Sequence, residues 1–150
     1  MSSKRSPRHF WKQHSLSLVA ASILLAWILL YVCGDPKTHI GGFYGNAVAD
    51  WTGLLVTVVG TKYFYERGSV ESRQPKPEFA NRLHELIHEH SLTIFLVLTG
   101  AGWAIIYAEM DANGKWGQVI GNIVSEWTQL LGIVLLTKRL IERGSKESRR

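Results

Sequence analysis

Four stretches of the chain are almost free of charged residues, and each has the length of a membrane span. They cover residues 16–33, 41–61, 92–108 and 117–137. An α-helix rises about 1.5 Å per residue, so roughly 20 apolar residues cross a hydrocarbon core about 30 Å thick. The pattern therefore predicts four transmembrane helices joined by short polar segments.

The chain also contains an internal duplication. Residues 14–73 align with residues 90–149 at a constant offset of 76 without a gap, and 24 of the 60 aligned pairs are identical. Each copy holds two of the apolar stretches, so the repeated unit is a helical hairpin. We therefore predict an all-α membrane protein with four transmembrane helices. It consists of two parallel two-helix repeats, related by a pseudo-two-fold axis along the membrane normal.

The predicted organisation has three parts. Residues 1–73 form the first transmembrane hairpin with a basic amino-terminal segment, residues 74–89 form a cytoplasmic linker, and residues 90–150 form the second hairpin with a basic tail. Within the linker, the stretch from 78 to 90 is expected to form a short amphipathic helix that lies on the membrane surface. Its apolar face consists of Phe79, Leu83, Leu86 and Ile87.

The positive charges predict the orientation in the membrane. Fifteen of the 17 Lys and Arg residues lie before the first stretch, between the second and third, or after the fourth, and only Lys37 and Lys115 lie in the two short loops. Segments rich in Lys and Arg stay on the cytoplasmic side, so both termini and the linker are predicted to be cytoplasmic in an inner (cytoplasmic) membrane. The net charge of +5 then favours anionic lipid headgroups as partners and makes nucleic acid an unexpected one.

Both hairpins are followed by the same four residues, Glu-Arg-Gly-Ser, at 66–69 and 142–145. Glycine is the usual residue just past the end of a helix, and a neighbouring arginine interacts favourably with the carbonyl end of the helix dipole. The interpretation favoured by this pattern is that Gly68 and Gly144 are helix C-caps. A binding motif is the alternative.

Two carboxylates interrupt the second and fourth apolar stretches at matching positions. Asp50 and Glu126 lie roughly 13 Å from the outer boundary if each residue adds about 1.5 Å. An ionised residue at that depth costs about 2.5 to 3.5 kcal/mol, so it needs water, a cation or a hydrogen-bond donor. Two adjacent carboxylates share a proton or hold a cation. The predicted ion or proton pathway consists of Asp50, Glu126, Asn46, Asn122, Thr57, Ser125 and Gln129.

A structural role for the same residues stays open. Small residues recur every four positions along both stretches, which is the pattern of closely packed membrane helices, so 41–61 and 117–137 are predicted to be the central pair. Each carboxylate would then be neutral or bonded to a polar group on a neighbouring helix. The small residues are Gly41, Gly45, Ala49 and Gly53 in the first copy and Gly117, Gly121 and Ser125 in the second.

The histidines of the linker raise the question of a metal site. His84-Glu85-Leu86-Ile87-His88 matches the His-Glu-x-x-His pattern of zinc proteases, and His90 is the nearest further ligand. The first copy has Arg8 and Lys12 in place of His84 and His88. Solvated histidines on an interfacial helix explain the segment better. We therefore expect no cofactor and no enzymatic activity, and His84, His88 and His90 form only a weak candidate metal site.

The second copy resembles a known family. The segments Ser125-Glu126-Trp127-Thr128-Gln129-Leu130, Leu136-Thr137-Lys138 and Arg143-Gly144-Ser145-Lys146-Glu147-Ser148-Arg149, together with His90-Ser91-Leu92, carry the resemblance. They are similar to a bacterial family of small integral membrane proteins classed as a domain of unknown function. The first copy matches more loosely, because Asp50 stands in place of Glu and Gly53 in place of Gln. The resemblance implies a multi-pass bacterial membrane protein and no known activity.

Two functions follow as hypotheses. Four spans enclose little room for a pore, so a conducting form would be a homo-oligomer whose carboxylates line a cation or proton path. The alternative is a structural or accessory subunit that binds a membrane partner or anionic lipid, with the carboxylates as hydrogen-bonding groups between helices.

Overall fold

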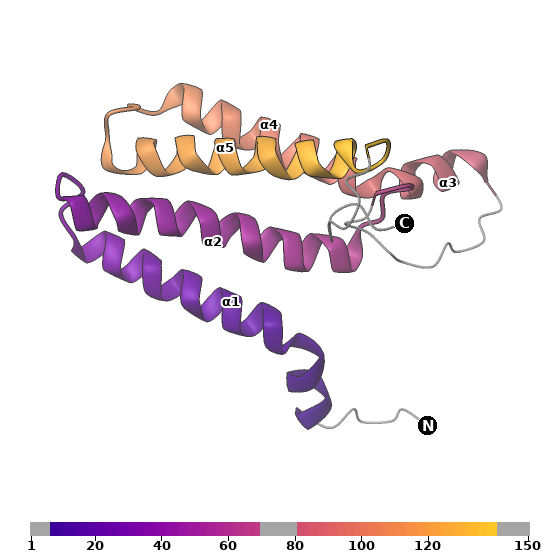
Figure 1. Cartoon of the computed structure of the whole chain (residues 1–150), viewed down its shortest axis with the longest axis horizontal. Coiled ribbons are helices and arrows are strands. Elements are labelled where there is room, and N and C mark those ends of the chain that lie inside the picture. The colour runs from indigo at the N-terminus through magenta and orange to yellow at the C-terminus, as the bar shows by residue number, and fades with distance from the viewer. Residues whose placement is uncertain (1–6, 70–80, 141–150) are drawn as a thin grey trace.

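The described part of the chain, residues 7–69 and 81–140 of a computed structural model, is helical. It contains α1 (Pro7–Cys33), α2 (His39–Tyr63), the short α3 (Arg82–Glu89), α4 (Ser91–Glu109) and α5 (Lys115–Leu136). Helices α1 and α2 form one antiparallel hairpin, α4 and α5 form another, and the two hairpins lie side by side (Figure 1). The all-α prediction is confirmed for these residues.

Three of the helices are long and apolar enough to cross a membrane. These segments are Gln13–Cys33 in α1, Ser91–Glu109 in α4 and Lys115–Leu136 in α5. The predicted span 41–61, which belongs to α2, is not among them. Its glycines, together with Asn46 and Asp50, lower its mean hydropathy below that of the other three.

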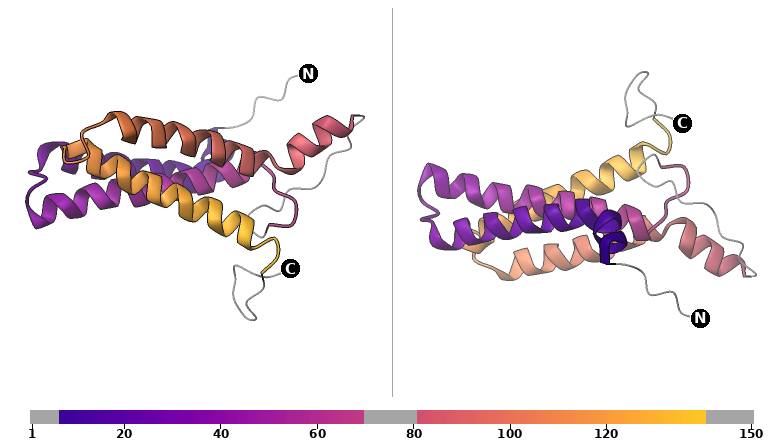
Figure 2. Two further views of the ribbon diagram at one scale, coloured as in Figure 1. Left: turned by 90° about the horizontal axis from the view of Figure 1, so that it is seen from above. Right: turned by 90° about the horizontal axis from the view of Figure 1, so that it is seen from below.

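Helices α2 and α5 are the central pair. They contact each other, and each also contacts its own hairpin partner (Figure 2). This confirms the prediction that the stretches 41–61 and 117–137 pack together. The core between the hairpins contains Val48 and Ala49 from α2 and Val119, Ile123 and Trp127 from α5, all of them buried.

Glycines allow close contacts that recur in both hairpins. A Cβ at Gly41 would overlap the backbone oxygen of Asp35, and a Cβ at Gly117 would overlap that of Asp111. The first turn of the returning helix therefore rests directly on the loop before it. One turn later, the positions of Gly45 and Gly121 each face a tyrosine ring at 3.0 Å, which again leaves no room for a larger residue.

The loop end of the molecule also ties the two hairpins together. The Nζ of Lys115 donates hydrogen bonds to the carbonyl oxygens of Val32 (3.0 Å) and Gly34 (2.8 Å), at the end of α1. In return, the hydroxyl of Tyr31 donates to the carbonyl oxygen of Lys115. A cation at the carbonyl end of a helix satisfies acceptors that have no partner inside that helix.

The predicted cap at Gly68 is wrong, because α2 ends at Tyr63, before the Glu-Arg-Gly-Ser segment. Phe64 already has an extended backbone, and Gly68 occupies a later turn with a φ of 84°. The chain leaves the helix because its backbone bonds elsewhere: the carbonyl of Tyr65 accepts a hydrogen bond from the amide of Leu92 at 3.0 Å. Gly144 lies outside the described residues.

The linker helix is present but shorter than predicted. It spans Arg82–Glu89 and begins at Asn81, whose Oδ1 accepts a hydrogen bond from the amide of Leu83 at 3.0 Å. The predicted apolar residues Leu83, Leu86 and Ile87 are exposed, and Phe79 lies outside the described residues. Helix α3 extends beyond the hairpins and meets α4 at His90 (Figure 2).

Candidate functional site

The two predicted carboxylates lie together on the central pair of helices. Glu126 of α5 packs over Gly53 of α2, where a Cβ would lie 3.3 Å from its Oε2. Asp50 lies one turn before Gly53 and is close enough to interact electrostatically with Glu126. The small side of Gly53 therefore brings the carboxylate of one repeat next to that of the other.

Amide side chains flank the carboxylates on the same helices. The Nδ2 of Asn122 donates a hydrogen bond to the Oδ1 of Asn46 at 2.6 Å, so two residues at equivalent positions of the repeats contact each other. The Nε2 of Gln129 lies 3.5 Å from the Oε1 of Glu126. Five of the seven predicted pathway residues thus form one polar face, which we call the carboxylate face: Asp50, Glu126, Asn46, Asn122 and Gln129.

The other two predicted residues are placed differently. The hydroxyl of Thr57 bonds to the carbonyl of Gly53 in its own helix at 3.0 Å, and its side chain lines a small apolar cavity of about 20 Å³. The side chain of Ser125 is exposed beside the carboxylate face. Thr57 therefore adds little to the polarity of this face.

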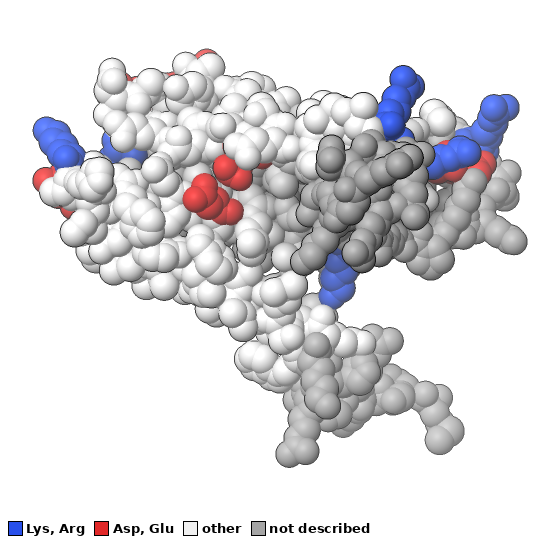
Figure 3. Space-filling view, in the orientation of Figure 1, with Lys and Arg blue, Asp and Glu red and all other residues white. Residues whose placement is uncertain are grey.

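The carboxylate face lies on the outside of the single chain. Asp50, Asn46 and Gln129 are exposed, and Glu126 and Asn122 are half-buried. In Figure 3 an acidic patch lies partway along a face that is otherwise uncharged, and the basic side chains lie toward the ends. In one copy of the chain, the carboxylates are therefore not covered by packed helices.

An open hollow of about 220 Å³ adjoins the asparagine pair on the side of the loops. Its lining is partly polar, whereas the cavity around Thr57, on the other side of the carboxylates, is apolar and much smaller. The carboxylate face is thus polar toward the loop end and apolar toward the opposite end. The hollow is lined by Tyr31, Gly42, Gly45, Asn46, Gln118, Val119 and Asn122.

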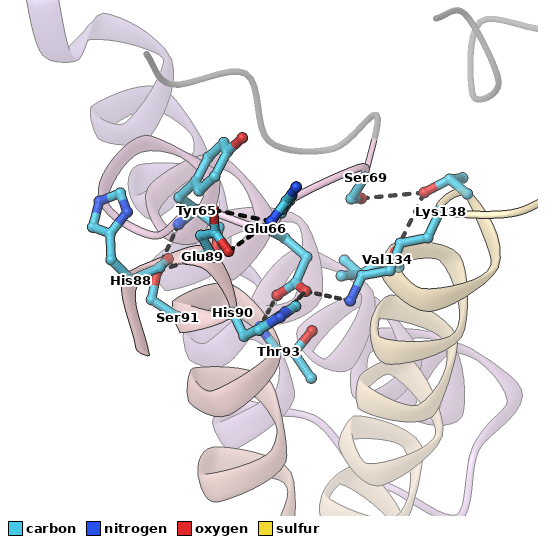
Figure 4. Close-up of polar contacts among 12 residues, drawn as sticks. Tyr65, Glu66, Ser69, His88, Glu89, His90, Ser91, Thr93, Val134 and Lys138 are labelled. Atoms are coloured by element: carbon cyan, nitrogen blue, oxygen red, sulfur yellow. Dashed lines mark hydrogen bonds and ion pairs between the residues drawn. The ribbon is translucent and has the colours of Figure 1, made fainter. Parts of the chain in front are cut away.

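A second polar cluster surrounds Glu66, just after α2. Its side chain is completely buried. The carboxylate points toward His90, Thr93 and Lys138 (Figure 4). Its Oε1 lies 2.7 Å from the Nδ1 of His90 and forms an ion pair with Lys138, and its Oε2 accepts a hydrogen bond of 3.0 Å from the amide of Thr93. Glu66 therefore joins the end of α2 to the start of α4 and the end of α5.

The ionised form of Glu66 is favoured. Burial raises the pKa of this carboxyl, but the hydrogen bonds from Lys138, Thr93 and His90 lower it more, and the resulting pKa lies below the ordinary value of glutamate. The amide of Thr93 belongs to the first turn of α4, where amides have no partner within the helix. Glu66 is thus an N-terminal cap of α4 supplied by the other repeat.

Further contacts hold the segment of Glu66 in place. The guanidinium of Arg67 pairs with the buried carboxylate of Glu89 at 3.1 Å, and its backbone amide donates to the carbonyl of Glu89 at 2.7 Å. The hydroxyls of Ser69 and Thr137 lie 3.1 Å apart. The segment 66–69 therefore joins the two repeats and is not a helix end.

Sequence reasoning did not assign Glu66 a site. The signal that would have found it is the duplication itself, because Glu66, His90 and Lys138 each have an identical counterpart 76 positions away. A glutamate, a histidine and a lysine that occur at the same positions in both copies of an apolar repeat indicate an ionic contact among them. The counterparts are Glu142, His14 and Lys62.

The weak candidate metal site does not come together. His90 bonds to Glu66, the ring of His88 stacks on Tyr65 with centroids 5.6 Å apart, and His84 is exposed. Within residues 7–69 and 81–140, no three His, Cys, Asp or Glu side chains are grouped to hold a metal ion. His84 and His88 lie on α3, whereas His90 lies beyond its last residue.

Comparison of the chain with protein-family models, curated proteins and solved structures found no match. The resemblance to a bacterial membrane family therefore stays a prediction. The fold defines the class only coarsely: a helical protein with three helices able to cross a membrane, which is compatible with a small membrane protein.

Proposed function

We propose that this chain is a small multi-pass membrane protein in which α2 crosses the membrane together with α1, α4 and α5. Both termini and α3 would lie on the cytoplasmic side. The repeats would be related by a pseudo-two-fold axis along the membrane normal. The contact between Asn46 and Asn122 supports this, since residues related by such an axis meet where it passes between two helices.

The observation that carries the proposed function is the exposure of the carboxylate face. Asp50 and Glu126 lie midway along the central helices and on the outside of the chain. A charged residue in contact with lipid at this depth costs about 2.5 to 3.5 kcal/mol. Contact with the same face of a second copy would remove it from lipid, so we infer a homo-oligomer in which the carboxylate faces meet.

The chemistry of the joined faces favours a cation or a proton. Neighbouring carboxylates repel each other when both are ionised, and a shared proton or a bound cation relieves that repulsion. The amides of Asn46, Asn122 and Gln129 supply neutral oxygens that replace water around a cation. The hollow beside the asparagines would admit water from the loop end, and the apolar region around Thr57 would be the narrow part of the path. We therefore propose a conducting oligomer for cations or protons.

The test is ion flux into proteoliposomes under an imposed cation or proton gradient. The flux through the Asp50→Asn/Glu126→Gln protein is expected to be at least about tenfold lower than through wild type. Each amide has nearly the shape of the carboxylate it replaces but removes a charge from the path. The matched control is Asp35→Asn/Asp111→Asn, which removes two acids from the loops. Each of these accepts a backbone hydrogen bond, at 2.9 and 3.0 Å, that an asparagine can also accept.

Flux that is lost in the first variant and kept in the control supports a pathway through the carboxylate face. Equal flux in wild type and in Asp50→Asn/Glu126→Gln would contradict it. Both proteins must be compared at the same oligomeric state, since loss of assembly would also abolish flux.

The second candidate is an accessory subunit whose carboxylate face is covered by another membrane protein. The exposed Asp50 and the half-buried Glu126 support it equally, because any polar partner helix would remove them from lipid. The two candidates differ in the purified protein. A pure homo-oligomer with flux favours conduction, whereas a monomer without flux under every gradient favours the accessory subunit.

A further inference from the structure

The hollow at the loop end is lined by matching residues of the two repeats. Gly42 and Gln118 are equivalent at the offset of 76, and so are Asn46 and Asn122. The first member of each pair belongs to α2 and the second to α5. The hollow of about 220 Å³ therefore lies between the repeats, next to the contact of the two asparagines.

The same pairs lead from the hollow to the carboxylates. Positions 42, 46 and 50 of α2 are spaced by four, as are positions 118, 122 and 126 of α5, so each set lies along one face of its helix. Gln118 precedes Glu126 by two turns, a rise of about 12 Å. An ion that enters from the loop end and moves along this face meets Gln118 before it meets Glu126.

The two repeats differ in side-chain size at the mouth of the hollow. Gly42 has no side chain, and no atom lies within 4 Å of the position that its Cβ would take. Its counterpart Gln118 has a long amide side chain. The same difference recurs beyond the carboxylates, where Gly53 of α2 is the counterpart of Gln129, whose Nε2 lies 3.5 Å from the Oε1 of Glu126. At both ends of this polar stretch, α5 has a glutamine where α2 has a glycine.

The lining of the hollow is polar but uncharged among the residues that the structure describes. Lys115 lies three residues before Gln118, and its Nζ donates to the carbonyl oxygens of Val32 and Gly34 at the end of α1. A glutamine amide has a carbonyl oxygen that can replace water around a cation. Because this oxygen is neutral, it holds the cation less tightly than a carboxylate does, which suits a residue that an ion must pass.

We propose that Gln118 is the specificity-determining residue at the outer mouth of the path, where an entering cation contacts its amide before it reaches Asp50 and Glu126. This role rests on the proposed function, a conducting oligomer whose carboxylate faces meet. It adds to that function the residue that selects the ion at entry.

Charge substitutions at position 118 test this role in proteoliposomes of the full chain, in which potassium, proton and chloride flux are measured. Gln118→Glu is expected to raise the ratio of cation to chloride flux at least about threefold, and Gln118→Lys to lower it by as much, because a charge in the mouth attracts or repels the ion. The matched control makes the same two changes at Asn113, an exposed loop residue outside the hollow. Both control variants are expected to keep the wild-type ratio at the same oligomeric state.

A thiol reagent gives a second readout that does not depend on charge. Gln118→Cys in a Cys33→Ser background is treated with a bulky neutral maleimide before reconstitution. The adduct is expected to lower cation flux at least about fivefold, because it occupies the hollow through which the ion enters. Asn113→Cys, treated in the same way, is expected to keep its flux.

Two results would overturn the role of Gln118 and leave the proposed function intact. One is flux that Asp50→Asn/Glu126→Gln abolishes but that no change at position 118 affects. The other is an equal response to the changes at positions 118 and 113, which would reflect the overall charge of the loop end. A wild-type protein without flux under every gradient would overturn the role of Gln118 and the proposed function together.

Discussion

Glu66 is a charged residue that is buried at the end of an apolar hairpin, and its side chain has no solvent exposure. Removing one member of such a buried set leaves a charge without its partner, which costs about 3 to 5 kcal/mol. Its role is therefore to join the two repeats, and its loss should weaken the packing of α2 against α4 and α5.

The pH dependence of stability follows from the lowered pKa of Glu66. The unfolded chain takes up a proton at the ordinary pKa of glutamate, about 4.3, whereas the folded chain holds Glu66 ionised to lower pH. The contribution of Glu66 is complete above that ordinary value and is lost as the pH falls through the lowered one. The melting temperature in detergent should therefore drop as the pH falls below the ordinary pKa of glutamate.

The control for this titration is Glu66→Gln. This variant should be less stable at pH 7, and the drop on acidification should be smaller than in wild type. Glu109→Gln, which changes an exposed glutamate at the end of α4, should keep the wild-type profile. Parallel profiles for wild type and Glu66→Gln would show that Glu66 does not contribute to the acid sensitivity.

The sequence predicted the two kinds of acidic residue with different success. Asp50 and Glu126 stand out because each interrupts an apolar stretch at the same position of the repeat, and the structure brings them together over Gly53. Glu66 lies in a mixed segment next to Arg67, where a helix cap is a sufficient explanation. Its burial depends on α2 ending at Tyr63, and single residues give little information on where a helix ends.

At the scale of elements, α2 lies in the central pair although it is not among the three helices apolar enough to cross a membrane. Both follow from its small residues, since glycine lets backbones approach but adds no apolar surface. The buried positions of α2 are nearly all Gly or Ala, with Val48 as the exception. The same small residues therefore place α2 in the central pair and lower its mean hydropathy.

Two adjacent glycines of α2 test this account. Gly41→Ala should destabilise the protein by about 1 to 3 kcal/mol, because the new Cβ would overlap the backbone oxygen of Asp35 and the loop would have to shift. Gly42 has no neighbouring atom within 4 Å of the same position. Gly42→Ala should be neutral or stabilising by up to about 1 kcal/mol, since alanine favours the helix. Melting temperatures in detergent measure both; equal effects would contradict the close contact.

The helices could be predicted because the apolar stretches and the distribution of charge are patterns that extend over many residues. The windows 16–33, 92–108 and 117–137 each lie within a helix or end one residue past it, and the choice of 41–61 and 117–137 as the central pair came from the spacing of small residues. The boundary between α3 and α4 also follows from the pattern, since the linker helix was expected over 78–90 and the next apolar stretch from 92. What could not be predicted is the set of bonds at this boundary: Glu66 bonds to His90, and the amide of Tyr65 donates to the hydroxyl of Ser91.

For the whole molecule, the proposed four-span arrangement makes a prediction about sidedness. Cys33 is the only cysteine, so single cysteines can be placed in a Cys33→Ser background. An impermeant maleimide added to intact cells should label Lys37→Cys and Lys115→Cys, in the two outer loops. It should label Arg82→Cys, at the start of α3, only after the membrane is permeabilised.

Labelling of Lys37→Cys and Arg82→Cys from the same side would mean that α2 does not cross, and the proposed topology would then be wrong. Lys37 and Arg82 are exposed, so the fold should tolerate a cysteine at either position. Lys115→Cys removes the two hydrogen bonds to the end of α1 and is expected to be the least stable of the three. Melting temperatures of the three variants provide the check.

The partners of Glu66 also bear on how the molecule arose. His90, Thr93 and Lys138 all belong to the second hairpin, so one hairpin alone leaves a buried acid and a basic site incomplete. An ancestor with a single hairpin would have been complete only as a pair of identical subunits. Fusion of two such genes holds the pair at a one-to-one ratio and frees each half to diverge, as Asp50 and Glu126 have already done.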